Sequence, residues 1–196
     1  MPKLWLVRHA QPLIDPGICY GRHDVPADAA ATRQAATRLH AALPAQLAGC
    51  WHSPLQRCEQ LALDTQALRP DLTLNSDDAL AELDFGRWEA RAWADIARAD
   101  IDAWTATFAH HPPGGGESLS AMLLRVADAL AQARRAAQLN NADVLWITHA
   151  GVVRCVLWLQ QHGARLPLAD EWTAPAPAYG EWMTVPLACT DTEVTG

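Results

Sequence analysis

Two histidines, His9 and His149, each end a segment that begins with a short apolar run, and Arg8 precedes the first of them. An imidazole can act as a nucleophile or carry a proton, and a guanidinium can hold two phosphoryl oxygens at once. Apolar runs of this kind predict buried strands of a parallel sheet. If the two strands are neighbours, both imidazoles meet at one carboxyl edge, where open α/β sheets bind their ligands.

Two more residues are expected at the same edge. Arg57 falls in the first turn of a helix that the pair Ser53-Pro54 is expected to start, as an N-cap followed by proline at the first helical position. A cation there is disfavoured by the helix dipole and indicates a compensating anion. Glu82 lies in a loop that can fold over the edge. The set predicts phosphoryl transfer, in which a histidine attacks phosphorus and a carboxylic acid protonates the leaving oxygen.

Other interpretations of these residues stay open. Two histidines and a glutamate are a common zinc set, although a guanidinium next to a dication is repulsive, so Arg8 argues against a metal. A buried histidine can also simply satisfy its neighbours, with the arginine in an ion pair. The pair His110-His111 lies in a loop rich in proline and glycine, and we interpret it as solvated surface.

Strands and helices alternate along the rest of the chain. Strands are expected to end at His52 and to cover 72–74 and 179–187. Helices are expected at 28–43, 54–68, 91–108, from 117 onward and at 152–161. This alternation predicts an α/β fold. We expect a single domain over 1–196, a three-layer α/β/α sandwich with a mostly parallel central sheet and a small helical cap at roughly 84–117.

Composition excludes several classes of function. The 196 residues carry a net charge of −7, with Lys3 the only lysine, and such an acidic chain without a basic stripe is a poor nucleic-acid binder. No segment is apolar enough to span a membrane and no secretion signal is evident, so we expect a cytoplasmic protein. Five scattered cysteines argue against a disulfide framework and predict buried thiols.

Nine tryptophans raise a further question. Trp88 and Trp93 flank the expected cap, where they could stack on a nucleobase-like ligand. We favour packing for both, because bulky aromatic side chains mainly supply buried area.

Five ordered blocks, spanning about residues 4 to 158, resemble the histidine phosphatase (phosphoglycerate mutase-like) superfamily. The first block, with its Arg-His pair, is similar to the Arg-His-Gly signature of that family. The blocks are Leu6–Ala10, Ser53–Cys58, Leu80–Glu89, Pro113–Ser118 and Thr148–Arg154.

The resemblance implies a metal-independent phosphomonoesterase without a cofactor. It implies that His9 is the phosphorylated nucleophile, that Arg8, Arg57 and His149 form the phosphate pocket, and that Glu82 is the proton donor. The expected catalytic residues are thus His9, Glu82, His149, Arg8 and Arg57. Substrate contacts are expected from Arg8, Gln11, Tyr20, Gly21, Arg22, Arg57, Glu82, His149 and Ala150.

Two segments, Tyr20–Pro26 and Asp84–Glu89, look most like the α-ribazole-5′-phosphate phosphatases of cobalamin synthesis, and also like general small phosphatases of the group. The expected partner is therefore a small phosphorylated metabolite, and the protein could pair with itself as a homodimer. Phosphoglycerate mutase-type transfer and a non-catalytic phospholigand-binding module remain alternatives. Alanines replace the usual glycines at Ala10 and Ala150, and Gln11-Pro12 stands where a serine or threonine is common.

Overall fold

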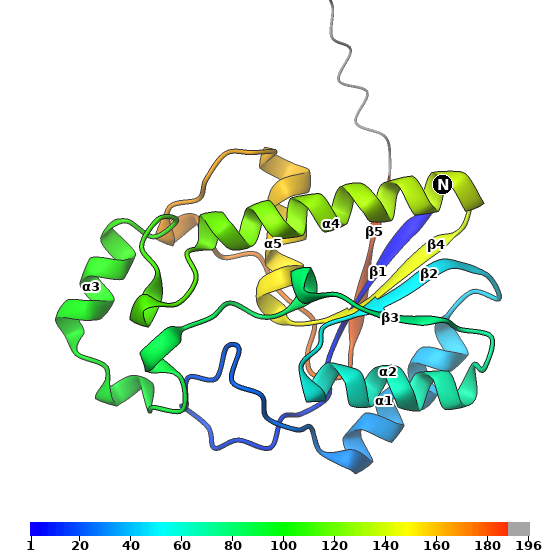
Figure 1. Cartoon of the computed structure of the whole chain (residues 1–196), viewed down its shortest axis with the longest axis horizontal. Coiled ribbons are helices and arrows are strands. Elements are labelled where there is room, and N and C mark those ends of the chain that lie inside the picture. Colours follow the sequence, from blue (N-terminus) through cyan, green and yellow to red (C-terminus); the bar gives the residue numbers. More distant parts are fainter. Residues whose placement is uncertain (188–196) are drawn as a thin grey trace, which may run out of the picture.

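The computed structural model describes residues 1–187, and they build an α/β fold around a five-stranded sheet (Figure 1). The strand order is β3-β2-β4-β1-β5. The pairings among β1 to β4 are parallel, whereas β5 runs antiparallel to β1, so the mostly parallel sheet expected from the sequence is confirmed. The strands are β1 (Lys3–Arg8), β2 (Leu47–His52), β3 (Leu74–Ser76), β4 (Asp143–Thr148) and β5 (Trp182–Pro186).

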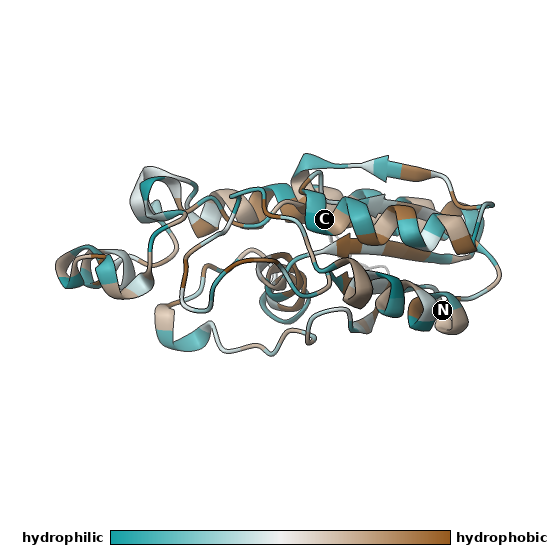
Figure 2. Ribbon diagram, turned by 90° about the horizontal axis from the view of Figure 1, so that it is seen from below, coloured by the Kyte–Doolittle hydropathy of each residue, from teal (hydrophilic) through white to brown (hydrophobic). Residues whose placement is uncertain are grey.

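Helices cover both faces of the sheet. One layer is formed by α1 (Ala29–Ala42) and α2 (Gln56–Leu68), and the other by α4 (Leu119–Asn140) and α5 (Ala150–His162). Successive strand residues point to opposite faces, so each strand feeds two cores. In Figure 2 apolar and hydrophilic residues alternate along the helices, as expected for helices that cover a core with one face. Leu4, Leu6, Val144 and Trp146 pack against α4 and α5, whereas Val7, Leu145 and Ile147 pack against α1 and α2.

The segment between Glu82 and α4 extends beyond the end of the sheet and carries α3 (Arg98–Ala106). Trp88 anchors this segment: only 1% of it is exposed, and it packs with Cys19 and Ile96. The packing function that we expected for Trp88 is confirmed.

Two helix predictions were wrong at their starts. Helix α2 begins at Gln56, and not at Pro54, because the Asp24 carboxylate from the first loop accepts the hydrogen bond of the Gln56 amide at 2.8 Å. The expected helix 91–108 is interrupted, since Ile96 turns inward to pack beside Trp88 and the backbone at Ala97 is extended. Only Arg98–Ala106 remains α-helical. The third strand was expected at 72–74 and lies at Leu74–Ser76.

The other expected helices are present. Asp28 caps α1 by accepting from the Ala31 amide at 2.7 Å, and Ser118 caps α4. The predicted strand 179–187 is shorter, at Trp182–Pro186. Within residues 1–187 no helix is long and apolar enough to cross a membrane.

Four cysteines are buried free thiols, as the sequence predicted: Cys19, Cys50, Cys58 and Cys155. Cys189 lies outside the described residues.

Two glycines, one in the first loop and one in the segment beyond the sheet, test how closely that segment is packed. Gly114 has φ +60°, and a Cβ there would overlap the Phe85 carbonyl oxygen, whereas Gly17 has φ +84° with no atom within 4 Å of an added Cβ. We predict that Gly17→Ala lowers the free energy of unfolding by about 1 kcal/mol, the cost of the backbone conformation alone. Gly114→Ala should cost about 3 kcal/mol, because the collision adds to that strain. Urea denaturation measures both, and equal losses would contradict the packing described.

Candidate active site

The two histidines of the sequence motif lie side by side at the carboxyl edge of the sheet. Strands β1 and β4 are neighbours, with Arg8 paired in register with Thr148, so the residues that follow leave the sheet together. The ring centroids of His9 and His149 are 5.1 Å apart. The expectation that both imidazoles meet at one edge is confirmed.

His9 is held as a neutral imidazole with one nitrogen available. Only 1% of it is exposed, and its Nδ1 lies 2.7 Å from the Ala10 carbonyl oxygen. A carbonyl can only accept, so Nδ1 carries the hydrogen and Nε2 keeps its lone pair. Burial, followed by the positive charges of Arg57 and Arg8, lowers the pKa of His9 to about 3, while the bond to Ala10 opposes the shift. The ring therefore presents an unprotonated Nε2 at neutral pH.

Arg57 is fully buried and anchored by the first loop. Its terminal nitrogens donate to the carbonyl oxygens of Gly21 at 2.6 Å and His23 at 2.9 Å. Its Nε–H is buried without a hydrogen-bond partner in the described part of the chain. Buried donors are nearly always satisfied, so an unpaired charged donor in a cluster of this kind points to a ligand acceptor.

Arg8 repeats this arrangement. One terminal nitrogen donates to the Pro177 carbonyl at 3.1 Å, and the Nε–H is buried with no partner within residues 1–187. The guanidinium lies 3.8 Å from the centre of the Tyr179 ring, a cation–π contact that fixes its plane. The hydroxyls of Tyr179 and Tyr20 are hydrogen bonded at 2.8 Å. Two guanidinium groups are thus fixed beside His9 by segments from opposite ends of the chain.

His149 is fully buried and is positioned by groups from the start of α2. Its Nε2 is hydrogen bonded to the Ser53 hydroxyl at 2.8 Å, and the Cys58 sulfur lies 3.4 Å from the same nitrogen. Burial, and then the charge of Arg57, hold the pKa of His149 well below its usual value. This second imidazole is also neutral in the folded protein.

The Glu82 carboxylate is fixed at the start of α5. One oxygen accepts from the Gly151 amide and the other from the Leu83 amide, each at 3.0 Å. An added Cβ at Gly151 would displace the Glu82 carboxylate from this position. The carboxylate is therefore held by a backbone amide that lies two residues beyond His149.

Arg125 holds the loop that carries Glu82. One terminal nitrogen donates to the carbonyls of Ala79 and Ala81 at 2.8 Å, and the guanidinium forms a two-pronged ion pair with Glu117. A bidentate pair of this kind is directional as well as strong. This ion pair joins the segment Pro113–Ser118, at the end of the cap, to the loop that carries Glu82.

The remaining residues that were expected to contact the substrate differ in where they lie. Tyr20 and Gly21 border Arg57, and Ala150 is the first residue of α5. Arg22 is exposed, and its amide donates to Glu89. The exposed Gln11 amide donates weakly, at 3.5 Å, to the Pro12 carbonyl and so bonds within its own loop. Neither Ala10 nor Ala150 has a positive φ, so alanine fits where the family usually has glycine.

Three contributors were missed from the sequence: Ser53 as a partner of His149, Tyr179 and Arg125. Arg125 had a usable signal, since it lies three residues after Met122 and next to Val126, at the edge of the apolar face of the helix. Tyr179 had none, because its contact with Arg8 joins residues far apart in the sequence.

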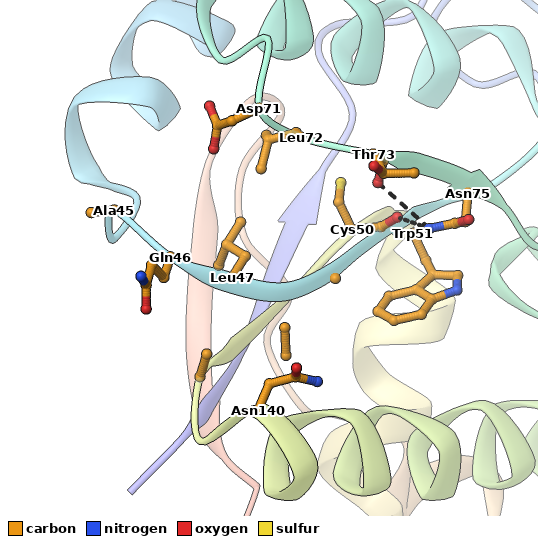
Figure 3. Close-up of a pocket in the computed structure, with 13 residues that line it drawn as sticks. Ala45, Gln46, Leu47, Cys50, Trp51, Asp71, Leu72, Thr73, Asn75 and Asn140 are labelled. Atoms are coloured by element: carbon orange, nitrogen blue, oxygen red, sulfur yellow. Dashed lines mark hydrogen bonds between the residues drawn. The ribbon is translucent and has the colours of Figure 1, made fainter.

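One cavity in the described part of the chain is bounded by residues of the site, whereas a larger groove is not. This groove, of about 520 Å³, is lined by β2 from Leu47 to Trp51 and by Asn75, and none of the expected site residues lines it (Figure 3). A smaller cavity of about 230 Å³ is bounded by Glu82 and Gly151. Among residues 1–187, no three His, Cys, Asp or Glu side chains are grouped to hold a metal ion.

Comparison with known families supports the motif assignment. The family model described as the histidine phosphatase superfamily (branch 1) matches residues 4–177. The bifunctional protein Rv2228c of Mycobacterium tuberculosis and the uncharacterized protein Mb2253c of Mycobacterium bovis are each 34% identical to the chain over 111 residues. The match covers 55% of this chain but only 29% of each relative, so the chain corresponds to under a third of their length.

Solved structures share the whole fold. TTHB049 from Thermus thermophilus is 30% identical with a TM-score of 0.67, covering 93% of this chain and 92% of that one. A mycobacterial glucosyl-3-phosphoglycerate phosphatase is 23% identical with a TM-score of 0.72, over 93% and 89% of the two chains. Mycobacterial hydrolase 2 is 21% identical with a TM-score of 0.77, over 93% and 81%. The last two show a likeness of fold.

The lowered pKa of His9 predicts a pH dependence of stability. Its pKa is about 3 in the folded protein against 6.5 ordinarily, so between these values the unfolded chain binds more protons. The free energy of unfolding should therefore fall as the pH is lowered from 6.5, and His149 contributes in the same direction. We predict that His9→Gln makes this fall shallower by about 1.4 kcal/mol per pH unit, one proton's worth. Urea titrations at several pH values measure the free energy of unfolding. Equal falls with pH for the wild type and for His9→Gln would contradict the prediction.

Proposed function

Because the chain belongs to the histidine phosphatase superfamily, we propose that it is a phosphomonoesterase that forms a phosphohistidine on His9. The observation that carries the proposal is a pair of guanidinium groups, those of the half-buried Arg8 and the fully buried Arg57. Their buried Nε–H donors have no partner in the described part of the chain, and they lie beside a neutral, Nδ1-anchored imidazole. A tetrahedral dianion supplies the acceptors that these donors lack.

The first step is attack of His9 Nε2 on phosphorus. A P–N bond forms as the P–O bond to the alcohol breaks, and the Glu82 carboxyl gives its proton to the departing oxygen. In the second step a water oxygen attacks phosphorus, its proton returns to Glu82, and the electron pair of the P–N bond returns to His9. Arg8, Arg57 and His149 stabilise the charge on the three phosphoryl oxygens, which needs no metal and no cofactor.

The sequence motifs also favour a particular substrate. Segments Tyr20–Pro26 and Asp84–Glu89 support α-ribazole 5′-phosphate as a candidate, with Arg22 as a further substrate contact. The fold likeness to a glucosyl-3-phosphoglycerate phosphatase makes a phosphorylated sugar acid the natural comparison. Only 67 positions separate Glu82 from His149, and the short cap that they enclose favours transfer to water over return to a sugar acid.

The test is a panel of phosphomonoesters with a chelator present, including α-ribazole phosphate, 3-phosphoglycerate and an aryl phosphate. The protein should hydrolyse at least one of them, and His9→Ala should lower kcat/KM on the order of 10³-fold or more. His110→Ala, at an exposed histidine of the cap, is the matched control and should leave the rate unchanged.

Three other outcomes would overturn the proposal, and each would indicate a different function. Binding of esters without hydrolysis would indicate a phospholigand-binding module. Transfer of the phosphoryl group to a sugar-acid hydroxyl would indicate a mutase. Activity lost with chelator and restored by zinc would indicate metal chemistry.

A further inference from the structure

A cavity of about 230 Å³ is lined on one side by Glu82 and Gly151. Its other walls are mainly aromatic and apolar. They are supplied by three parts of the chain that are distant in sequence: the cap, the start of α4 and the segment after α5. The aromatic side chains are Phe85, Trp93, Trp104, Phe108 and Trp172.

We propose that this cavity holds the leaving group and selects phosphate esters whose alcohol carries a flat, weakly polar ring. The inference rests on the proposed function, because it takes Glu82 as the acid. That residue lines the cavity, and its carboxylate accepts from the Gly151 amide, two residues beyond His149. The alcohol whose oxygen receives the Glu82 proton then extends into the aromatic walls.

The walls are arranged for a planar group. The rings of Trp93 and Trp104 are within 16° of parallel, with centroids 6.5 Å apart, and Phe85 meets each of them edge-on at 88°. A flat ring can continue this alternation of parallel and edge-on contacts, which aromatic groups prefer.

Two tryptophans of the cap, for both of which the sequence favoured packing, lie in different surroundings. Trp88 is buried and packs edge-on against both Trp93 and Trp104, so it forms their base. Trp93 keeps 37% of its surface exposed and lines the cavity. A large apolar ring held rigid yet left open is typical of a binding wall, so packing alone does not describe Trp93.

Size and charge narrow the class of ligand. A cavity of about 150 Å³ takes benzene, so this one fits a single ring or a small fused pair. The charged side chains that line it are Glu82 and Arg154, and the Nε of Arg154 already donates to the Ala174 carbonyl at 3.0 Å. A polyol or sugar acid would leave most of its polar groups unpaired against these walls, which costs binding energy.

Three esters of primary alcohols test the selection, because their leaving groups have similar basicity: 2-(1-naphthyl)ethyl phosphate, butyl phosphate and glycerol 3-phosphate. We expect kcat/KM for the naphthyl ester to exceed that for butyl phosphate by about tenfold or more, and glycerol 3-phosphate to be the poorest. Equal values, or a preference for glycerol 3-phosphate or 3-phosphoglycerate, would overturn the inference.

A matched pair of variants localises the effect. Trp93→Ala should lower kcat/KM for the naphthyl ester by a larger factor than for butyl phosphate, and so remove most of the naphthyl preference. Trp51→Ala removes a half-buried tryptophan from the groove in Figure 3 and should leave the preference intact. Circular dichroism checks that both variants fold, and Trp93→Phe should retain part of the preference if Trp93→Ala does not fold.

Product binding keeps this inference separate from the proposed function. The alcohol 2-(1-naphthyl)ethanol should quench tryptophan fluorescence at concentrations at least tenfold below those of butanol, whether or not any ester is hydrolysed. Binding of the alcohol without hydrolysis would contradict the phosphatase and leave the cavity assigned. Hydrolysis without ring preference and without quenching would contradict the cavity alone.

Discussion

Burial of the Arg57 guanidinium is the constraint around which the site is built. A buried charge is costly unless it is hydrogen bonded, and here the first loop supplies two carbonyls, from Gly21 and His23, for the terminal nitrogens. The Nε–H has no partner within residues 1–187, and burial together with this charge lowers the pKa of both His9 and His149. One buried cation therefore fixes the conformation of the loop, adds to the effect of burial that keeps both imidazoles neutral, and creates the need for an anion.

The same loop is coupled to the segment that carries the acid. Glu89 accepts from the amides of Arg22 and Phe85, at 2.7 and 2.9 Å, and burial raises the pKa of its carboxyl. Arg125 and Glu117 join the end of the cap to the Glu82 loop. Polar contacts thus join the first loop to the cap, and the end of the cap to the loop that carries Glu82.

Much of this arrangement could be predicted from local sequence. Apolar runs that end in His9 and His149 identified two parallel strands, and the helix dipole argument identified Arg57 as a residue in need of an anion. The interrupted helix 91–108 could not be predicted, because the inward turn of Ile96 depends on packing with Trp88 and Cys19. The start of α2 was missed for a similar reason, since its cap is the distant Asp24. The partners of Arg8 and His149 also come from remote segments, and local patterns carry no signal for them.

We propose that His9 accepts the phosphoryl group through Nε2, because Nδ1 is bonded to the Ala10 carbonyl oxygen. Rapid acid-free quenching of a reaction with ³²P-labelled substrate, followed by peptide mapping and ³¹P NMR of the trapped adduct, measures this directly. We predict an acid-labile, alkali-stable phosphoryl group on His9 with phosphorus bound to Nε2. Label on a serine or aspartate, or phosphorus bound to Nδ1 of His9, would contradict it.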